Sequence, residues 1–498
     1  GVSGYFDARQ NVWQEPIYRN VFALLDEFGD AELASLIAPR ALVIEACRVP
    51  QVSGPPRPHD GRNNSAAPGR LTTPSVATVR SELDRAGALV AGLPMRRGFQ
   101  LAASGEGDGP PGSVAAFERF LAALPGDAKL APLSAPPTHL RQAFDTQARL
   151  GRLFQQIKDD TQFLLSQGEA TRAVLWSKAD RASRDVEKWR ASTQSYRQHF
   201  YNEVIGRFDR QFSPANVRTR QIYDEPKYVG YEVVMNVFPD VFAYGILLMP
   251  KDIMPGERRP VVVCQHGLEG RPTDVADATK NNPAYNQYAC RLAERGFIAY
   301  APQNPYIFTD RFRTLQRKAN PLGKTLFSVI VPQHQQTVDW LAGLPQVDPG
   351  RIAFYGLSYG GKTAMRVPAL VERYCLSICS ADFNEWVWKN ASTSSPYSYV
   401  ATGEYEIFEF DLGNTYNYAE MAGLIAPRPF MVERGHRDGV GPDTQVSYEF
   451  AKIRLLYADL KIPERAAIEY FDGPHTIHGV GTFDFLYKNL NWPDQLNR

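Results

Sequence analysis

The sequence lacks an apolar run long enough to cross a membrane, because no stretch approaches the roughly 20 apolar residues that a spanning helix needs. It also lacks an excess of either charge, with 55 Lys and Arg against 54 Asp and Glu and a net charge of +1. This balance gives no electrostatic reason to expect binding to nucleic acid or to an anionic membrane surface. The first residues carry neither a charged segment nor a long apolar stretch, so no signal peptide is predicted there.

Cysteine is scarce as well. The chain has five cysteines, an odd number, and it has no C-x-x-C pair. A disulfide framework is therefore not expected, and we predict buried, reduced thiols. Cysteine usage does not identify the cellular compartment.

What the sequence does contain is an internal repeat. Residues 31–46 and 419–434 are identical at nine of sixteen positions, including the run Leu-Ile-Ala-Pro-Arg. The first copy has nothing that matches residues 229–365. We therefore predict a tandem duplication whose first copy is truncated; the alternative is a half-domain that borrows its remaining strands elsewhere.

A chain of 498 residues is too long for one hydrophobic core, and the repeat suggests where it divides. We predict a partial copy at 1–125, a linker with amphipathic helices at 126–215, and the complete copy at 216–498. From about residue 216, short apolar strands alternate with helices, which is typical of a mostly parallel sheet flanked by helices. The predicted hairpin lies at 230–238 and 241–249, further strands at 260–265, 297–302, 352–355, 376–380, 429–434 and 466–471, and helices at 284–294 and 333–344.

Residues 356–363 satisfy two incompatible patterns. Gly356-Leu357-Ser358-Tyr359-Gly360 is G-x-S-x-G, the sharp strand-to-helix turn that presents a serine nucleophile. The same segment reads G-x-x-x-x-G-K-T, the phosphate-binding loop of an NTPase. Such a loop normally follows an early strand of its domain, whereas this one follows about the fifth. We favour the serine nucleophile and keep the NTPase as an alternative.

An acid and a base follow Ser358 in the order that α/β hydrolases use. Asp438 stands just after the strand 429–434, and His475 lies on the loop past the last strand. Sites of open α/β sheets assemble at these carboxyl ends of strands. Asp382 is the alternative acid, and His478 is a competing base.

The oxyanion hole and the truncated copy complete this hypothesis. The loop after strand 260–265 would donate the backbone N–H of Leu268, and the residue after the nucleophile would donate that of Tyr359. In the first copy Pro50 falls opposite Asp438, and the loop 104–110 contains no histidine. We therefore predict that the first copy is not catalytic.

The motifs together resemble the dienelactone hydrolase and acetylxylan esterase group of α/β hydrolases. The resemblance rests on Val-Asp-Pro-Gly-Arg-Ile leading into Gly-Leu-Ser-Tyr-Gly-Gly, with His-Gly upstream and Gly-Pro-His downstream. It implies an α/β-hydrolase fold over 216–498, preceded by a truncated, degenerate hydrolase-like domain and a helical linker. It further implies a serine esterase that uses neither metal nor cofactor. Ser-Tyr-Gly-Gly also occurs in prolyl-oligopeptidase-type sequences, so a serine peptidase is a second alternative.

The expected substrate is a small-molecule or carbohydrate ester, and a polysaccharide ester would favour a secreted or periplasmic location. Candidate substrate-binding residues are His266 and three tyrosines of the aromatic-rich insertion 385–418, namely Tyr397, Tyr399 and Tyr405. These rings would either stack on sugar rings or pack against the first copy. The segment 305–328 carries Arg311, Arg313 and Arg317, which would favour a substrate with a carboxylate. Lys362 is assigned no catalytic role.

Overall fold

The computed structural model describes residues 1–52, 69–94, 98–126, 128–132, 134–136, 138, 140–141, 144–307, 311–402 and 408–493. The chain forms two compact units. The first comprises residues 1–158 together with 316–323, and the second comprises 159–315 and 324–498. One boundary therefore falls inside helix α5 (Thr146–Ser166), and a short piece of helix α10 (Arg311–Ala319) belongs to the first unit.

The first unit has a small parallel sheet in the order β1-β2-β3, with helices between its strands. Its elements are β1 (Val2–Ser3), α1 (Leu24–Glu27), α2 (Asp30–Ser35), β2 (Leu42–Ala46), α3 (Val76–Leu89), β3 (Phe99–Ala103) and α4 (Val114–Ala123). Its core consists of apolar residues of β2 and the faces of α2 and α3 that pack on it.

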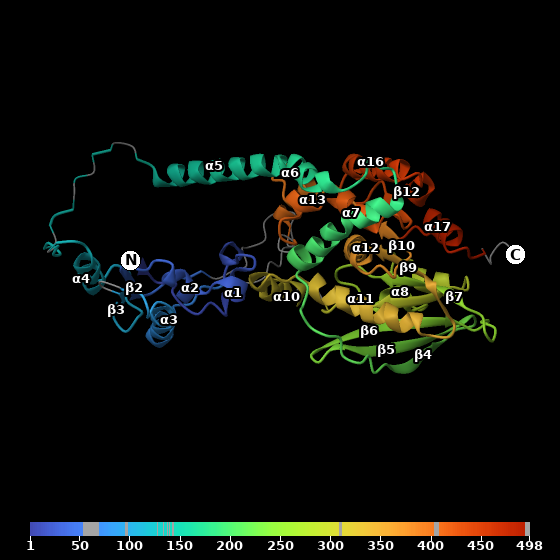
Figure 1. The fold of residues 1–498 in the computed structure, drawn as a ribbon, viewed down its shortest axis with the longest axis horizontal. Coiled ribbons are helices and arrows are strands. Elements are labelled where there is room, and N and C mark those ends of the chain that lie inside the picture. Colours follow the sequence, from blue (N-terminus) through green and yellow to red (C-terminus); the bar gives the residue numbers. More distant parts are fainter. Residues whose placement is uncertain are drawn as a thin grey trace. The chain divides into compact units, whose positions relative to one another are not determined.

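The second unit is built on a large mixed sheet in the order β12-β11-β10-β9-β7-β8-β6-β5-β4 (Figure 1). Strands β7 to β12 pair in parallel with one another, while β4, β5 and β6 pair antiparallel at one edge and β6 also pairs antiparallel with β8. The strands are β4 (Arg218–Asp224), β5 (Tyr228–Phe238), β6 (Val241–Pro250), β7 (Arg259–Gln265), β8 (Ile298–Pro302), β9 (Val347–Leu357), β10 (Leu376–Ser380), β11 (Phe430–Gly435) and β12 (Ala466–Phe471). The predicted hairpin and the six predicted strands that follow it are confirmed.

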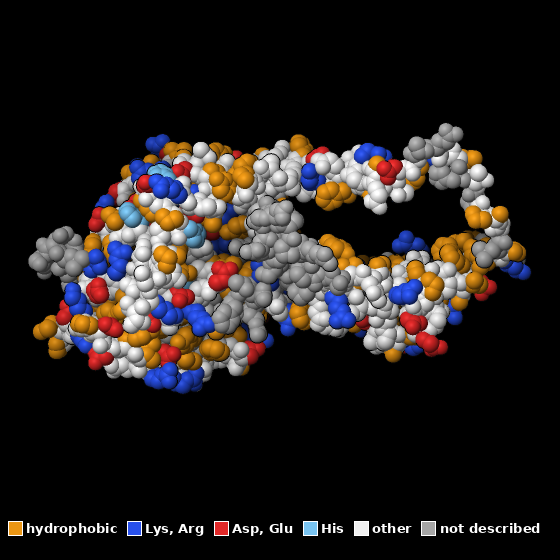
Figure 2. Space-filling model, turned by 180° about the vertical axis from the view of Figure 1, so that it is seen from behind, with side chains coloured by type: hydrophobic (Ala, Val, Ile, Leu, Met, Phe, Trp, Pro, Cys, Tyr) orange, Lys and Arg blue, Asp and Glu red, His pale blue; other side chains and the backbone are white. Residues whose placement is uncertain are grey.

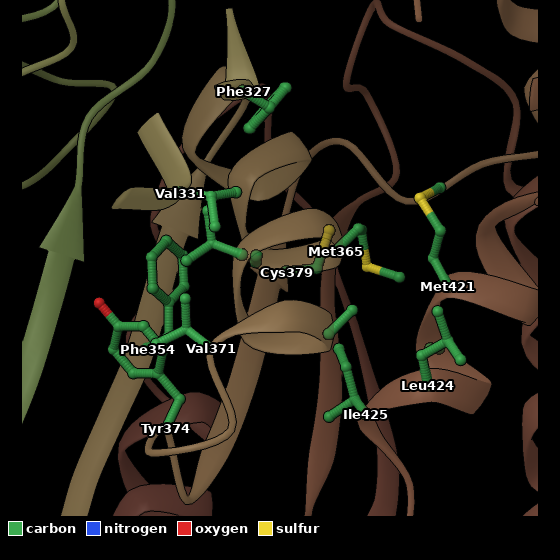
Figure 3. Close-up of a cluster of buried hydrophobic side chains, with 14 of the residues drawn as sticks. Phe327, Val331, Phe354, Met365, Val371, Tyr374, Cys379, Met421, Leu424 and Ile425 are labelled. Atoms are coloured by element: carbon green, nitrogen blue, oxygen red, sulfur yellow. The ribbon is translucent and has the colours of Figure 1, made fainter. Parts of the chain in front are cut away.

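Helices cover both faces of this sheet and enclose two cores. The helices are α6 (Gly168–Leu175), α7 (Val186–His199), α8 (Pro272–Ala276), α9 (Tyr288–Ala293), α11 (Phe327–Ala342), α12 (Tyr359–Leu370), α13 (Trp386–Asn390), α14 (Leu412–Thr415), α15 (Tyr418–Ile425), α16 (Asp443–Asp459) and α17 (Gly481–Asn489). Figure 3 shows one core, where α11, α12 and α15 meet β9 and β10 through Phe327, Val331, Phe354, Met365, Cys379, Met421, Leu424 and Ile425. These side chains are close-packed, and their contacts hold α12 in place against the sheet.

The same buried glutamate arrangement occurs in each unit. In the second unit Glu433 on β11 accepts hydrogen bonds from Ser380 Oγ at 2.6 Å and from the Gly479 N–H at 2.9 Å. In the first unit Glu45 on β2 accepts from Ser3 Oγ at 2.6 Å and from the Gly112 N–H at 2.8 Å. In each case the serine is the register partner of the glutamate on the neighbouring parallel strand. Each glutamate thereby holds the loop that follows the next strand, β3 in the first unit and β12 in the second, against the strand that carries the glutamate.

The surface agrees with the balanced composition. Basic and acidic side chains are interspersed over the face in Figure 2. Within the described part of the chain, none of the helices has the length and apolar character needed to cross a membrane. All five cysteines are free thiols, and four of them are buried.

Candidate active site

Ser358 alone separates strand β9, which ends at Leu357, from helix α12, which begins at Tyr359. Its backbone has φ 60° and ψ −117°, a conformation that L-residues rarely adopt and that costs about 1–3 kcal/mol. A Cβ at Gly356 would collide with the carbonyl of Gly360, and a Cβ at Gly360 would collide with the carbonyl of Gln265. Both glycines of G-x-S-x-G are therefore required by close backbone contacts, and they hold Ser358 on a sharp turn.

This turn is too short to act as a phosphate-binding loop. A P-loop places a run of backbone N–H groups around a phosphate, between the end of its strand and the start of its helix. Here one residue separates strand and helix, and Gly360 and Gly361 already lie in α12, packed against the backbones of Gln265 and Ser380. The NTPase pattern in residues 356–363 therefore has no matching loop in the fold.

Asp438 and His475 lie on loops that follow neighbouring strands, β11 and β12. His475 Nδ1 is 2.8 Å from Asp438 Oδ1, and the side chain of Asp438 is fully buried. A carboxylate can only accept, so Nδ1 carries the proton and leaves Nε2 as a proton acceptor. The two loops are joined by the Arg437 N–H, which donates to the Gly473 carbonyl at 3.0 Å.

Arg434 positions this carboxylate and was missed by sequence reasoning. Its guanidinium lies 3.3 Å from Asp438 Oδ2, and it also donates to the Asp438 carbonyl at 3.2 Å. The Val440 N–H donates to Asp438 Oδ1 at 3.1 Å. Oδ1 therefore accepts two hydrogen bonds, while Oδ2 has the charge of Arg434 beside it but no hydrogen-bond partner among the described residues. The only sequence signal was a basic residue four positions before the predicted acid.

The two rival residues have other partners. Asp382 accepts from Lys389 Nζ and from the Tyr418 hydroxyl, both at 2.7 Å. Burial opposes its ionisation, but the charges of Lys389 and Lys362 outweigh that effect and lower the pKa of Asp382 to about 2. His478 Nδ1 lies 2.7 Å from Glu469 Oε1. Of the two aspartates, Asp438 is the one that contacts a candidate base.

A cavity of about 260 Å³ opens beside Ser358 in the second unit. Its walls are formed by Leu268, Glu269, Ser358, Tyr359, Lys362, Asp382, Pro396, Tyr397, Tyr399, Thr402, Gly439 and Val440. The cavity thus brings together the candidate nucleophile, both candidate oxyanion residues and two of the three candidate tyrosines. Tyr405 lies outside the described residues. A separate void of about 10 Å³ in this unit holds at most one water.

His266 directly follows strand β7 and is absent from the described cavity wall. Its side chain is fully buried, and its Nδ1 lies 2.7 Å from the Gly267 carbonyl. Burial lowers the pKa of His266 to about 4, so the imidazole is neutral. The Gly267 N–H donates to the Tyr285 hydroxyl at 2.8 Å. His266 and Tyr285 therefore fix the loop that carries Leu268.

Of the three arginines predicted in segment 305–328, Arg313 and Arg317 do not line the described cavity, and the side chain of Arg311 lies outside the described residues. Arg317 belongs to the first unit, where its guanidinium donates to the Glu15 carbonyl at 2.6 Å. Arg313 is buried with its guanidinium over the Phe312 ring. The cation on the described cavity wall is instead Lys362. Among the described residues, no cluster of three or more His, Cys, Asp or Glu side chains is placed to hold a metal ion.

Comparison with known proteins gives relatives of limited similarity. No family model matches the chain. A Bacillus subtilis (strain 168) protein named "Putative hydrolase YtaP" is 26% identical over 140 residues, which are 27% of this chain and 44% of that protein. The chain thus aligns with less than half the length of this curated relative.

Two solved structures resemble the chain in part. One is a "putative acetyl xylan esterase" from Bacteroides fragilis NCTC 9343, with 17% identity, 62% of this chain and 84% of that chain covered, and a TM-score of 0.47. The other is a carbohydrate esterase family 15 glucuronoyl esterase from Caldicellulosiruptor kristjansonii, with 16% identity, 62% and 87% covered, and a TM-score of 0.45.

Proposed function

We propose that the second unit is an α/β hydrolase that cleaves carboxylic esters with Ser358, His475 and Asp438. The observation that carries this proposal is the position of three loops that follow the carboxyl ends of the parallel strands β9, β11 and β12. Ser358 is held on a strained one-residue turn after β9, and the hydrogen-bonded pair Asp438 and His475 follows β11 and β12. A nucleophile, a base and an orienting acid from three parallel strands are the parts that acyl transfer needs.

In the proposed mechanism, Ser358 Oγ attacks the ester carbonyl while His475 Nε2 takes its proton. Asp438 holds the imidazole in the tautomer that leaves Nε2 free, and it stabilises the imidazolium that forms. His475 then protonates the departing alcohol, and water hydrolyses the acyl-enzyme.

The backbone N–H groups of Leu268 and Tyr359 are the proposed oxyanion donors. Both residues line the cavity beside Ser358, and Tyr359 is the first residue of α12, where N–H groups point out of the helix end. Each such donor stabilises the tetrahedral intermediate by about 3–4 kcal/mol. The packing of His266 and Tyr285 against the Gly267 backbone keeps the Leu268 donor in place before substrate binds.

We propose acetyl or other small acyl esters of carbohydrates as the substrate class. Tyr397 and Tyr399 present aromatic rings to a cavity of about 260 Å³, and tyrosine combines a stacking face with a hydroxyl that hydrogen-bonds to sugars. The name of the Bacillus relative, a hydrolase, is consistent with this chemistry.

We further infer that the first unit is a truncated and non-catalytic copy of the second. Both contain the buried glutamate network of Glu45 and Glu433 described above. In addition, the Ala31 N–H donates to Glu82 at 2.7 Å, and the Ala419 N–H at the matching repeat position donates to Glu449 at 3.0 Å. The hydrogen bonds that support the scaffold thus occur in both units, while the candidate acid and base occur only in the second. This is expected if the first unit has to fold but not to catalyse a reaction.

The proposed function is tested by hydrolysis of p-nitrophenyl acetate. The wild-type chain is expected to release p-nitrophenol, and Ser358→Ala is expected to lower kcat by at least about 10⁴-fold. Ser447→Ala, an exposed serine on α16, is the matched control and keeps the wild-type rate. A wild-type chain inactive on short acyl esters, or a Ser358→Ala variant as active as the control, would contradict the proposal.

A further inference from the structure

The cavity wall contains a buried cation whose charge is not matched by a partner. Lys362 is 2% exposed, and its Nζ has no hydrogen-bond or ion-pair partner among the described residues. Its Nζ lies 5.5 Å from the centroid of the Tyr399 ring, and the charge of Asp382 acts on it without a direct ion pair. An ammonium group that leaves water without a partner loses several kcal/mol of solvation, and a cation–π contact returns only part of that.

The charges around Lys362 are already paired with one another. Arg366 forms two hydrogen bonds with Glu409, at 2.9 and 2.7 Å, and Lys389 donates to Asp382 at 2.7 Å. Among the described residues the cluster therefore holds three cations and two anions, and the cation without a directly bonded anion is Lys362, which reaches the cavity. Burial lowers the pKa of Lys362 to about 8, which still leaves it mostly protonated at neutral pH.

Lys362 stands one helical turn from the candidate nucleophile. Its backbone N–H donates to the Ser358 carbonyl at 2.8 Å, and both residues line the same cavity. A ligand group that meets the ammonium is therefore close to the ester carbonyl that Ser358 attacks. Glu269, the other unpaired charge on the wall, is exposed to solvent and is screened there.

We propose that Lys362 binds a carboxylate carried by the substrate next to its scissile ester. This inference rests on the proposed esterase function and narrows its substrate class to anionic esters. A single negative charge completes the charge balance of the cluster and replaces the hydration that the ammonium loses. The carboxylate belongs either to the acyl part, as in a dicarboxylic half-ester, or to the sugar, as in an acylated uronic acid.

Two pairs of substrates test the proposal, and they distinguish a carboxylate on the acyl part from a carboxylate on the sugar. The acyl pair is p-nitrophenyl hydrogen succinate against p-nitrophenyl butyrate. The alcohol pair is an acetylated methyl glucuronide against the corresponding acetylated methyl glucoside, with acetate release as the readout. In at least one pair, the wild-type kcat/KM for the anionic member is expected to exceed that for the neutral member by about tenfold or more, the range of one charge-assisted contact.

The variant Lys362→Met keeps an unbranched side chain and removes the charge, and it is expected to reduce this ratio to about one. Lys488→Met, which changes an exposed lysine on α17, is the matched control and keeps the wild-type ratio. A wild-type ratio near one in both pairs overturns the proposal even if Lys362→Met fails to fold, because a sugar hydroxyl would then satisfy the ammonium equally well. A ratio that survives in Lys362→Met or Lys362→Gln overturns it too. Absence of all hydrolysis, including that of p-nitrophenyl acetate, would instead contradict the esterase function.

Discussion

Replacing Asp438 by Asn separates the two candidate acids and follows directly from the contacts around this carboxylate. The amide must place its oxygen on one side and its NH₂ group on the other. The Arg434 guanidinium lies 3.3 Å from Oδ2, and its full charge attracts the amide oxygen more strongly than the Val440 N–H on the Oδ1 side does, so the oxygen is expected to turn toward Arg434. The NH₂ group then faces His475 Nδ1, at the position where Oδ1 now lies 2.8 Å away.

An NH₂ group at that position donates to Nδ1 and forces the proton of the imidazole onto Nε2. His475 then cannot accept the proton of Ser358. The same substitution in serine-protease triads lowers kcat by about 10⁴-fold, and we expect a loss of that size, about 5.5 kcal/mol of transition-state stabilisation. The assay is steady-state hydrolysis of p-nitrophenyl acetate, with circular dichroism to show that the variant is folded.

Asp382→Asn is the matched comparison because it makes the same change at the rival position. Its main effect is expected on stability, by about 3–5 kcal/mol, since the buried Lys389 loses its partner at 2.7 Å. We expect its kcat to stay within about tenfold of wild type. The reasoning is refuted if Asp382→Asn loses about 10⁴-fold in kcat while Asp438→Asn stays within tenfold of wild type.

Three further predictions concern the scaffold and the cavity. Gly360→Ala is expected to cost at least about 3 kcal/mol of stability, because the new Cβ meets the Gln265 carbonyl; a loss below about 1 kcal/mol in urea unfolding would contradict this. Glu433→Gln and Glu45→Gln each weaken a buried set of donors and should each cost about 2–4 kcal/mol; unchanged unfolding midpoints would show that these networks are not structural. The pKa of Lys362 falls from 10.5 to about 8 on folding, so the unfolded chain binds more protons between these pH values and stability rises with pH there. The unfolding free energy of wild type minus that of Lys362→Met should therefore increase by about 3 kcal/mol from pH 8 to pH 10.5, and a flat difference would be inconsistent with a buried, unpaired lysine.

Much of the second unit was predictable because its strands are short apolar runs with helices between them. The strand before Asp438 ends one residue beyond its predicted end, and the strand before Ser358 continues two residues beyond its predicted end, to Leu357. G-x-S-x-G was informative because both of its glycines are required by close backbone contacts, that of Gly356 within the turn and that of Gly360 with Gln265 of β7. Strand β4 escaped prediction because it is an exposed edge strand with a largely polar sequence.

The remaining features depend on contacts between distant segments, which a single sequence does not reveal. Arg434 acts on Asp438 because the loop after β11 folds back over its own strand. Among the described residues Lys362 has no ion-pair partner because Asp382 is bonded to Lys389, and that pairing depends on where α13 packs. The assignment of residues 316–323 to the first unit likewise has no sequence signal.

The central claim is that Ser358 is the nucleophile, and active-site labelling tests it most directly. The full chain is treated with a fluorophosphonate probe, digested, and mapped by mass spectrometry, with Ser358→Ala as the control. The account predicts a single covalent adduct on the peptide that contains Ser358, and none in the variant. No adduct on the wild-type chain, or an adduct on a different serine, would contradict it.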